Sequence, residues 1–179
     1  MSAFSSQQSL LELQSRRLFE SLLCEVLPLS EYSKTYEIRW SDIDANNHVN
    51  YAAYIDAAAD LRYRYFTEHG FPPERFVQLG VGPVYTAIRA EFLREVRMGE
   101  TVTIAYALAG LSPLGVRWKV RHDVLKSNGK KAVSIEVEGV LLDLTARKPV
   151  PPIPELLQTF HLVPRTTDFE VLPEMRRMK

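Results

Sequence analysis

The fold is decided by residues 39–51, which read Arg-Trp-Ser-Asp-Ile-Asp-Ala-Asn-Asn-His-Val-Asn-Tyr. Before this stretch, residues 35–40 alternate between apolar and polar side chains and predict a half-buried strand that includes Trp40. After it, an alanine-rich run predicts one long helix from about Asn50 to about His69, with Gly70 as its C-terminal stop. A strand therefore enters, and a helix leaves, a loop that is rich in carboxylates, amides and an imidazole.

Four later segments alternate with a period of two residues and are joined by short turns, so we expect four antiparallel neighbouring strands. These segments are residues 84–93, 101–108, 116–121 and 132–138. The turn between the last two contains Asn128-Gly129, a pair that favours a type I′ hairpin turn. With the first strand, the pattern predicts an α+β fold in which an antiparallel five-stranded sheet wraps around one long helix, because this arrangement buries both the helix and one sheet face.

The chain has 179 residues, which is enough for one domain of this kind with two extensions. Residues 1–30 hold an amphipathic helix over Ser9–Val26, which we expect to dock on the body or on another subunit. The domain itself is expected over residues 31–146. Residues 147–179 form a C-terminal extension that begins with a Pro-rich, extended segment.

Composition excludes several classes of protein. The 22 Lys and Arg residues balance 22 Asp and Glu residues, so no net charge draws the chain to nucleic acid or to an anionic membrane. No run of about 18 apolar residues occurs, so we expect no membrane insertion. Acidic residues within the first 27 argue against a targeting signal, and the single Cys24 suits a reducing compartment. We therefore expect a cytoplasmic protein.

The polar residues of 39–51 are candidates for structural roles as well as for catalysis. Asp42 is expected to cap a turn, Asn50 to stand at the helix N-cap, and Asn47 to tolerate a left-handed conformation. For Asp44 and His48, a structural role in the loop and a catalytic role both stay open. A calcium loop is excluded because its glycine and its final glutamate are absent, and serine-hydrolase, dinucleotide-binding and zinc-protease motifs do not occur. We expect no metal.

Four charged residues lie further along the helix, where spacing brings them to neighbouring turns: Asp56, Asp60, Arg62 and Arg64. Pairs of opposite charge at this spacing support exposed helices. We therefore expect a solvated face with local ion pairs.

The order of elements and the loop resemble the hotdog-fold thioesterases similar to 4-hydroxybenzoyl-CoA thioesterase. The resemblance covers residues 36–144 and rests on Ser41–Asp44, on His48–Asn50 and on the turn at Arg94–Glu100. The same loop is also similar to the Asp-x-Asn-x-His-Val-Asn element of plant acyl-ACP thioesterases. The resemblance implies an enzyme that hydrolyses an acyl-CoA thioester, or with less support an acyl-ACP thioester, to a free acid and a thiol.

The resemblance also implies roles for single residues. In the hydroxybenzoyl-CoA branch the catalytic aspartate corresponds to Asp44, as nucleophile or as base, and the oxyanion donor to the backbone N–H of Tyr51. In the acyl-ACP branch Asp44, Asn46 and His48 act together. The His-Val-Asn sequence departs from many members of the first branch, so both mechanisms stay open. The expected substrate-binding residues are Asn50, Tyr54 and Arg89.

Hotdog proteins resemble one another in pairing two sheets, with the site between subunits, so we expect a homodimer or a homotetramer. The only coenzyme expected is the coenzyme A moiety of the substrate. Two other functions share this fold: binding of an acyl thioester without cleavage, and hydration or dehydration of an acyl thioester. Release of free thiol distinguishes hydrolysis from both.

Overall fold

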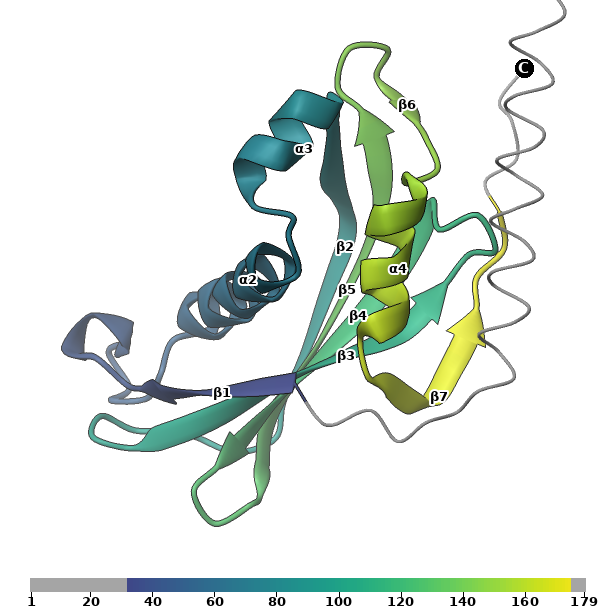
Figure 1. Ribbon diagram of the computed structural model, residues 1–179. Coiled ribbons are helices and arrows are strands. Elements are labelled where there is room, and N and C mark those ends of the chain that lie inside the picture. Colours follow the sequence, from purple (N-terminus) through teal and green to yellow (C-terminus); the bar gives the residue numbers. More distant parts are fainter. Residues whose placement is uncertain (1–31, 175–179) are drawn as a thin grey trace, which may run out of the picture.

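The computed structural model describes residues 32–174 (Figure 1). The helix predicted over Ser9–Val26 and the single cysteine lie outside these residues. The described elements, in chain order, are β1 (Tyr32–Glu37), the 3₁₀ helix η1 (Trp40–Asp42), α2 (Tyr51–Glu68), α3 (Pro73–Leu79), β2 (Val81–Phe92), β3 (Thr101–Leu111), β4 (Arg117–Lys126), β5 (Lys131–Asp143), β6 (Lys148–Pro149), α4 (Pro154–Leu162) and β7 (Arg165–Val171).

The sheet curves around α2, as Figure 1 shows. Its main strands run in the order β1-β3-β4-β5-β2, and every neighbouring pair is antiparallel. The α+β fold, with a five-stranded antiparallel sheet around one long helix, is therefore confirmed. The described sheet also holds two strands that the sequence did not predict: β6 pairs with β5, and β7 runs parallel to β3.

Helix α2 begins and ends where the sequence predicts. Its N-cap is Asn50, and the chain leaves it through Gly70, whose φ of +82° is one that glycine adopts without strain. Its buried face carries Tyr54, Ala58 and Leu61, spaced by three or four residues as one side of a helix requires. The small alanine at the middle of this face lets the sheet approach closely.

The C-terminal segment belongs to the same core. Helix α4 buries Leu156, Leu157 and Phe160, and the Tyr65 hydroxyl of α2 donates a 2.9 Å hydrogen bond to the Thr159 carbonyl oxygen. Residues 147–174 therefore cover one end of the curved sheet, where the sequence suggested an extension.

Two local predictions were wrong. Trp40 does not continue the first strand, because β1 ends at Glu37 and Trp40 begins η1 with 82% of its surface exposed. The β4–β5 turn is not of type I′, which requires positive φ at both central residues. Only Gly129 has a positive φ there, +76°, and its N–H donates to the Lys126 carbonyl oxygen.

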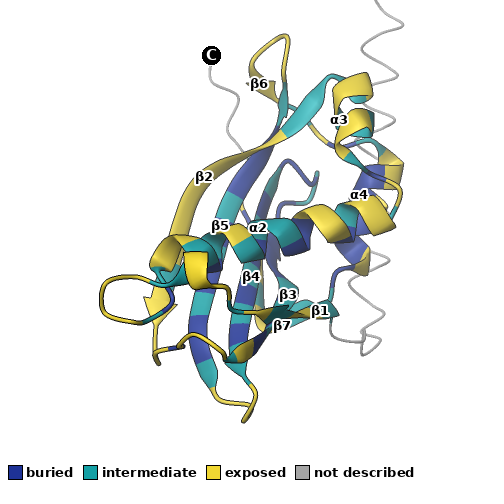
Figure 2. Cartoon of the chain, turned by 90° about the vertical axis from the view of Figure 1, so that its left-hand side faces the viewer, coloured by how far each residue is buried: buried dark blue, intermediate teal, exposed yellow. Residues whose placement is uncertain are grey.

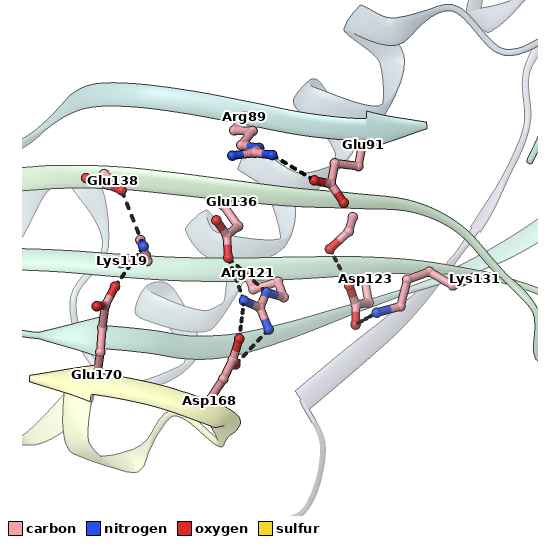
Figure 3. A network of polar contacts seen from close by, with 11 residues as sticks. Arg89, Glu91, Lys119, Arg121, Asp123, Lys131, Glu136, Glu138, Asp168 and Glu170 are labelled. Atoms are coloured by element: carbon pink, nitrogen blue, oxygen red, sulfur yellow. Dashed lines mark hydrogen bonds and ion pairs between the residues drawn. The ribbon is translucent and has the colours of Figure 1, made fainter. Parts of the chain in front are cut away.

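The two faces of the sheet differ. Residues of β3, β4 and β5 alternate between buried and half-exposed, whereas β2, at the free edge, is largely exposed (Figure 2). The outer face carries ion pairs: Arg121 bridges Glu136 and Asp168, and Lys119 bridges Glu138 and Glu170 (Figure 3). Such a polar outer face is typical of an antiparallel sheet that faces water on one side.

Within the described residues, no helix has the length and apolarity needed to cross a membrane.

Candidate functional site

The loop between η1 and α2 is a small closed hairpin. Ile43 pairs with Val49 in a β-bridge, the Asp44 N–H donates to the His48 carbonyl oxygen at 2.8 Å, and the Asn47 N–H donates to the Asp44 carbonyl oxygen at 3.1 Å. Asn47 has a φ of 60°, the left-handed conformation predicted for it. The Val49 N–H binds the Val96 carbonyl oxygen and ties the hairpin to the segment before β3. The loop is therefore held in one shape.

Asp44 stands at the mouth of this hairpin with its carboxylate exposed to solvent. Its Oδ1 accepts two backbone hydrogen bonds, from the N–H of Asn46 at 2.8 Å and of His48 at 3.2 Å. The bond from His48, with that from Asn46, lowers the pKa of the Asp44 carboxyl below its usual value. The carboxylate is thus ionised and anchored through one oxygen, which leaves Oδ2 for chemistry.

Asn46 contributes to the same group from two sides. Its backbone N–H holds Oδ1, and its side-chain amide also favours the ionised form of Asp44, which adds to the lowering of the pKa. The structure therefore brings Asn46 and Asp44 together, as the sequence predicted for a shared site.

The start of α2 supplies hydrogen-bond donors. Asn50 Oδ1 accepts the Ala53 N–H at 2.9 Å, whereas the N–H groups of Tyr51 and Ala52 have no acceptor in the described part of the chain. First-turn N–H groups together with the helix dipole favour a negative charge. Tyr51 has a largely exposed side chain, so its predicted contribution is through its backbone.

His48 has a partner that the sequence did not reveal. Its Nε2 lies 2.8 Å from Oε2 of Glu95, a residue in the segment between β2 and β3 that also pairs with Arg97 at 2.9 Å. A carboxylate on one ring nitrogen fixes the orientation of an imidazole. Glu95 is 47 positions from His48 (95 − 48), and no local pattern links them. Its place in the Arg94–Glu100 turn was the one available signal.

Two residues of the loop have structural roles. Asp42 accepts the Arg39 N–H at 2.8 Å and closes η1, as its predicted capping role requires. Asn50 uses both ends of its amide, because Oδ1 caps α2 and Nδ2 donates to the Asp42 carbonyl oxygen at 2.9 Å. The role of Asn50 in the structure is therefore an N-cap, and its predicted contact with substrate stays a prediction.

The other two predicted substrate-binding residues lie in different places, Tyr54 in the core and Arg89 on the outer face of the sheet. Tyr54 is buried in the core with its ring 6.1 Å from that of Phe92, and burial, together with Glu100, raises the pKa of its hydroxyl to about 12. Arg89 lies on the outer sheet face, where it pairs with Glu91 at 3.0 Å (Figure 3). No described contact links Arg89 to the loop.

A groove of about 760 Å³ extends from the loop between β1 and α2. Asp42 and Val49 line it at the loop, and Tyr54 and Tyr36 line it further along. Its basic side chains are already paired, for instance Arg64 with Asp60 at 2.7 Å. Among residues 32–174, no group of three or more His, Cys, Asp or Glu side chains is placed to hold a metal ion.

The curved sheet, its central helix and the anchored carboxylate before that helix define a hotdog-fold protein. The family model of the Thioesterase-like superfamily matches residues 38–160, and the chain belongs to that superfamily. This match runs past residue 146 into α4, in agreement with the place of α4 in the core.

Solved structures support the fold. A hypothetical protein of Staphylococcus aureus, characterised in complex with CoA, superposes with a TM-score of 0.71 at 18% identity, over 84% of this chain and 94% of that chain. A 1,4-dihydroxy-2-naphthoyl-CoA thioesterase of Synechocystis gives a TM-score of 0.67 at 10% identity, over 73% and 96%. A comparison with curated proteins gives no match.

Proposed function

We propose that this protein hydrolyses an acyl-CoA thioester to a free acid and coenzyme A. The observation that carries the proposal is the Asp44 carboxylate, which is ionised and anchored through Oδ1. It lies in the hairpin that leads into α2, and the first N–H groups of that helix, those of Tyr51 and Ala52, are unpaired in the described residues. Membership of the Thioesterase-like superfamily and the likeness to a CoA-bound structure support this choice of reaction and carrier. An acyl-ACP substrate has less support.

In the proposed reaction the thioester carbonyl lies between the Asp44 carboxylate and the N–H groups at the start of α2. In one route, Oδ2 of Asp44 attacks the carbonyl carbon and the C–S bond breaks, which gives a mixed anhydride that water hydrolyses and a thiolate that takes up a proton. In the other, Oδ2 removes a proton from a water that attacks the carbonyl carbon, the C–S bond breaks, and the thiolate takes up that proton. The N–H groups of Tyr51 and Ala52 stabilise the negative charge on the carbonyl oxygen, which is worth about 3 kcal/mol of barrier for one such donor. No metal or further cofactor takes part in this route.

We propose that His48, oriented by its contact with Glu95, handles the proton at the leaving group. A thiolate leaves readily, so this assistance is smaller than that of Asp44. We propose that Asn46 orients the carboxylate, because its backbone N–H holds Oδ1.

The test is Asp44→Asn, which keeps an oxygen that accepts the two loop hydrogen bonds but removes the charge. Thiol release from short, long and aromatic acyl-CoAs should fall by at least about a hundredfold while the protein stays folded, as circular dichroism checks. Asp42→Asn is the matched control, in the same loop but in the η1 cap, and should keep most of the activity. Unchanged turnover in Asp44→Asn would refute the assignment. Tight binding of acyl-CoA without thiol release would favour a non-catalytic binding protein.

We also propose that the protein forms at least a homodimer, through β2. This edge strand has 12 residues and exposes Tyr85, Ile88 and Phe92 to solvent. A long apolar edge of this kind is normally paired or covered. Ile88→Lys should convert the oligomer to monomers in light scattering after gel filtration, whereas Leu162→Lys, an exposed leucine on α4, should not. A monomeric wild-type protein would contradict the proposal.

A further inference from the structure

A second cavity lies at the other half of α2, away from the Asp44 loop. It measures about 330 Å³, within the range of small-molecule sites, which begins at about 300 Å³. The C-terminal half of α2, α3, the start of β2 and the concave face of the sheet enclose it. Its walls are largely aromatic and include Phe66, Phe71, Phe76, Tyr85, Trp118 and Phe160. No residue of the 39–51 loop lines it.

This apolar cavity contains a positive charge. Arg62 lines it and is only 6% exposed. Its Nη1 donates to Nε2 of His122 at 2.8 Å, and its guanidinium lies 5.2 Å from the centre of the Tyr85 ring. Because a guanidinium has only donors, His122 accepts this bond and is neutral. Within residues 32–174, no carboxylate forms an ion pair with Arg62, and its Nε has no hydrogen-bond partner.

Two more polar groups of the cavity wall are unpaired. The hydroxyl of Tyr106 and the indole Nε1 of Trp118 are buried and have no hydrogen-bond partner in the described chain. With Arg62, they give three donors from α2, β3 and β4 around one apolar space. Buried donors are normally paired, and a buried charge normally has a counter-charge. Residues 32–174 supply neither an acceptor for these donors nor a carboxylate for Arg62.

We propose that this cavity binds an apolar carboxylic acid, with its carboxylate against Arg62 and Tyr106 and its hydrocarbon or aromatic body against the phenylalanines. One carboxylate supplies the missing negative charge and enough acceptor positions for the unpaired donors. A phosphate, with more charge and more oxygens, is a poorer match to a single arginine in an apolar wall. The site is separate from Asp44 and does not rest on the proposed hydrolysis.

The protein offers its own probe for this site. It has two tryptophans, of which Trp118 lines the cavity and Trp40 is exposed. In a Trp40→Phe background, the fluorescence of Trp118 reports on the cavity alone. Titration with octanoate should change this emission and saturate, and calorimetry should give the same affinity. Octanol, which has the same chain without the charge, should bind at least about tenfold more weakly.

Three variants test the assignment of the carboxylate. Arg62→Met should remove the preference for octanoate over octanol while keeping an apolar side chain of similar length. Tyr106→Phe, which loses only the unpaired hydroxyl, should weaken octanoate binding about threefold to tenfold. Arg64→Met, two positions along the same helix but paired with Asp60 outside the cavity, should leave the preference unchanged.

The same chemistry could be the far end of an acyl thioester, so a second arm uses non-hydrolysable thioethers of coenzyme A. An eight-carbon chain that ends in a carboxylate is compared with one that ends in a methyl group. If octanoate does not bind but the carboxylate-ended thioether is preferred, and Arg62→Met abolishes this preference, the carboxylate in the site belongs to the acyl chain of a substrate. The proposal is overturned if octanoate and octanol bind the wild-type cavity equally well. It is also overturned if neither octanoate nor the carboxylate-ended thioether binds there.

Discussion

The two ends of α2 handle charge in opposite ways. At its start, two polar side chains near the surface are held by hydrogen bonds: Asp44 by backbone N–H groups of its own loop, and His48 by Glu95. In its second half, Arg62 is buried among aromatic rings with a neutral histidine as its partner. The first arrangement suits a reactive group that must stay ionised next to water. The second suits a ligand that brings the missing charge with it.

Arg62 and Arg64 show how little separates the two situations in sequence. Arg64 forms the predicted ion pair with Asp60 at 2.7 Å on the exposed side of the helix. Arg62 was expected on that same solvated face, but this expectation is wrong, because two residues of helix turn it toward the sheet. The difference between a surface ion pair and a buried charge therefore lies in the position of the strands that cover the helix.

The largest expected effect concerns the cavity wall. A Cβ at Gly139 would overlap the indole of Trp118 and lie 2.6 Å from the Val84 carbonyl oxygen. Gly139→Ala should therefore lower the free energy of unfolding in urea by about 3 kcal/mol. Gly99→Ala is the matched control near the loop, since Gly99 needs only its left-handed φ of +82° and has open space around it. Its cost should be about 1 kcal/mol. A smaller loss of unfolding free energy for Gly139→Ala than for Gly99→Ala would show that the cavity wall shifts to accommodate the added methyl group.

Much of the fold was predictable because it depends on neighbours in sequence. The alternation of β3, β4 and β5, the cap at Asn50 and the left-handed Asn47 follow from local rules. The partners that matter most at the two sites are remote: Glu95 reaches His48 across 47 positions (95 − 48), and His122 reaches Arg62 across 60 (122 − 62). One sequence carries no signal for such pairs. The same reason explains why β7 and the core position of α4 were missed.

The second effect is a loss of stability in mild acid. Burial, and then the charge of Arg62, lower the pKa of His122 well below 6.5, and burial with Arg165 lowers the pKa of His161 to about 4. In the unfolded chain these two histidines take up a proton near pH 6.5, whereas in the folded chain they stay neutral at that pH. The contribution of these histidines to stability is therefore complete above that pH and is lost as the pH falls below it, by at most about 1.4 kcal/mol for each pH unit and histidine.

Urea unfolding at several pH values measures this slope, and His122→Gln should reduce it. The Asp44 carboxyl behaves in the opposite sense, because its lowered pKa gives a contribution that is present above the usual aspartate pKa and lost only as the pH falls through the lowered value. A His122→Gln variant with an unchanged slope would contradict the buried, neutral state of His122.

The third effect tests whether Arg62 serves a ligand or the fold. Replacing a buried charge without a counter-ion by an apolar side chain is often stabilising, so Arg62→Met should raise the unfolding free energy of the ligand-free protein by about 1 kcal/mol. Arg64→Met removes an exposed ion pair and should change it by less than about 0.5 kcal/mol. Thermal unfolding of both variants gives the comparison. A clear loss of stability in Arg62→Met would show that the arginine supports the fold on its own.

The smallest effect separates structure from binding at the loop. Asn50→Ala removes the acceptor for the Ala53 N–H and the donor to the Asp42 carbonyl oxygen, and should cost about 1 kcal/mol of unfolding free energy. Asn50→Asp keeps the acceptor and should recover most of this loss. If Asn50 is only a cap, the KM for acyl-CoA stays near the wild-type value in both variants. A rise in KM in Asn50→Asp without a loss of stability would instead place its amide on the substrate, because the cap is intact there and the amide donor is gone.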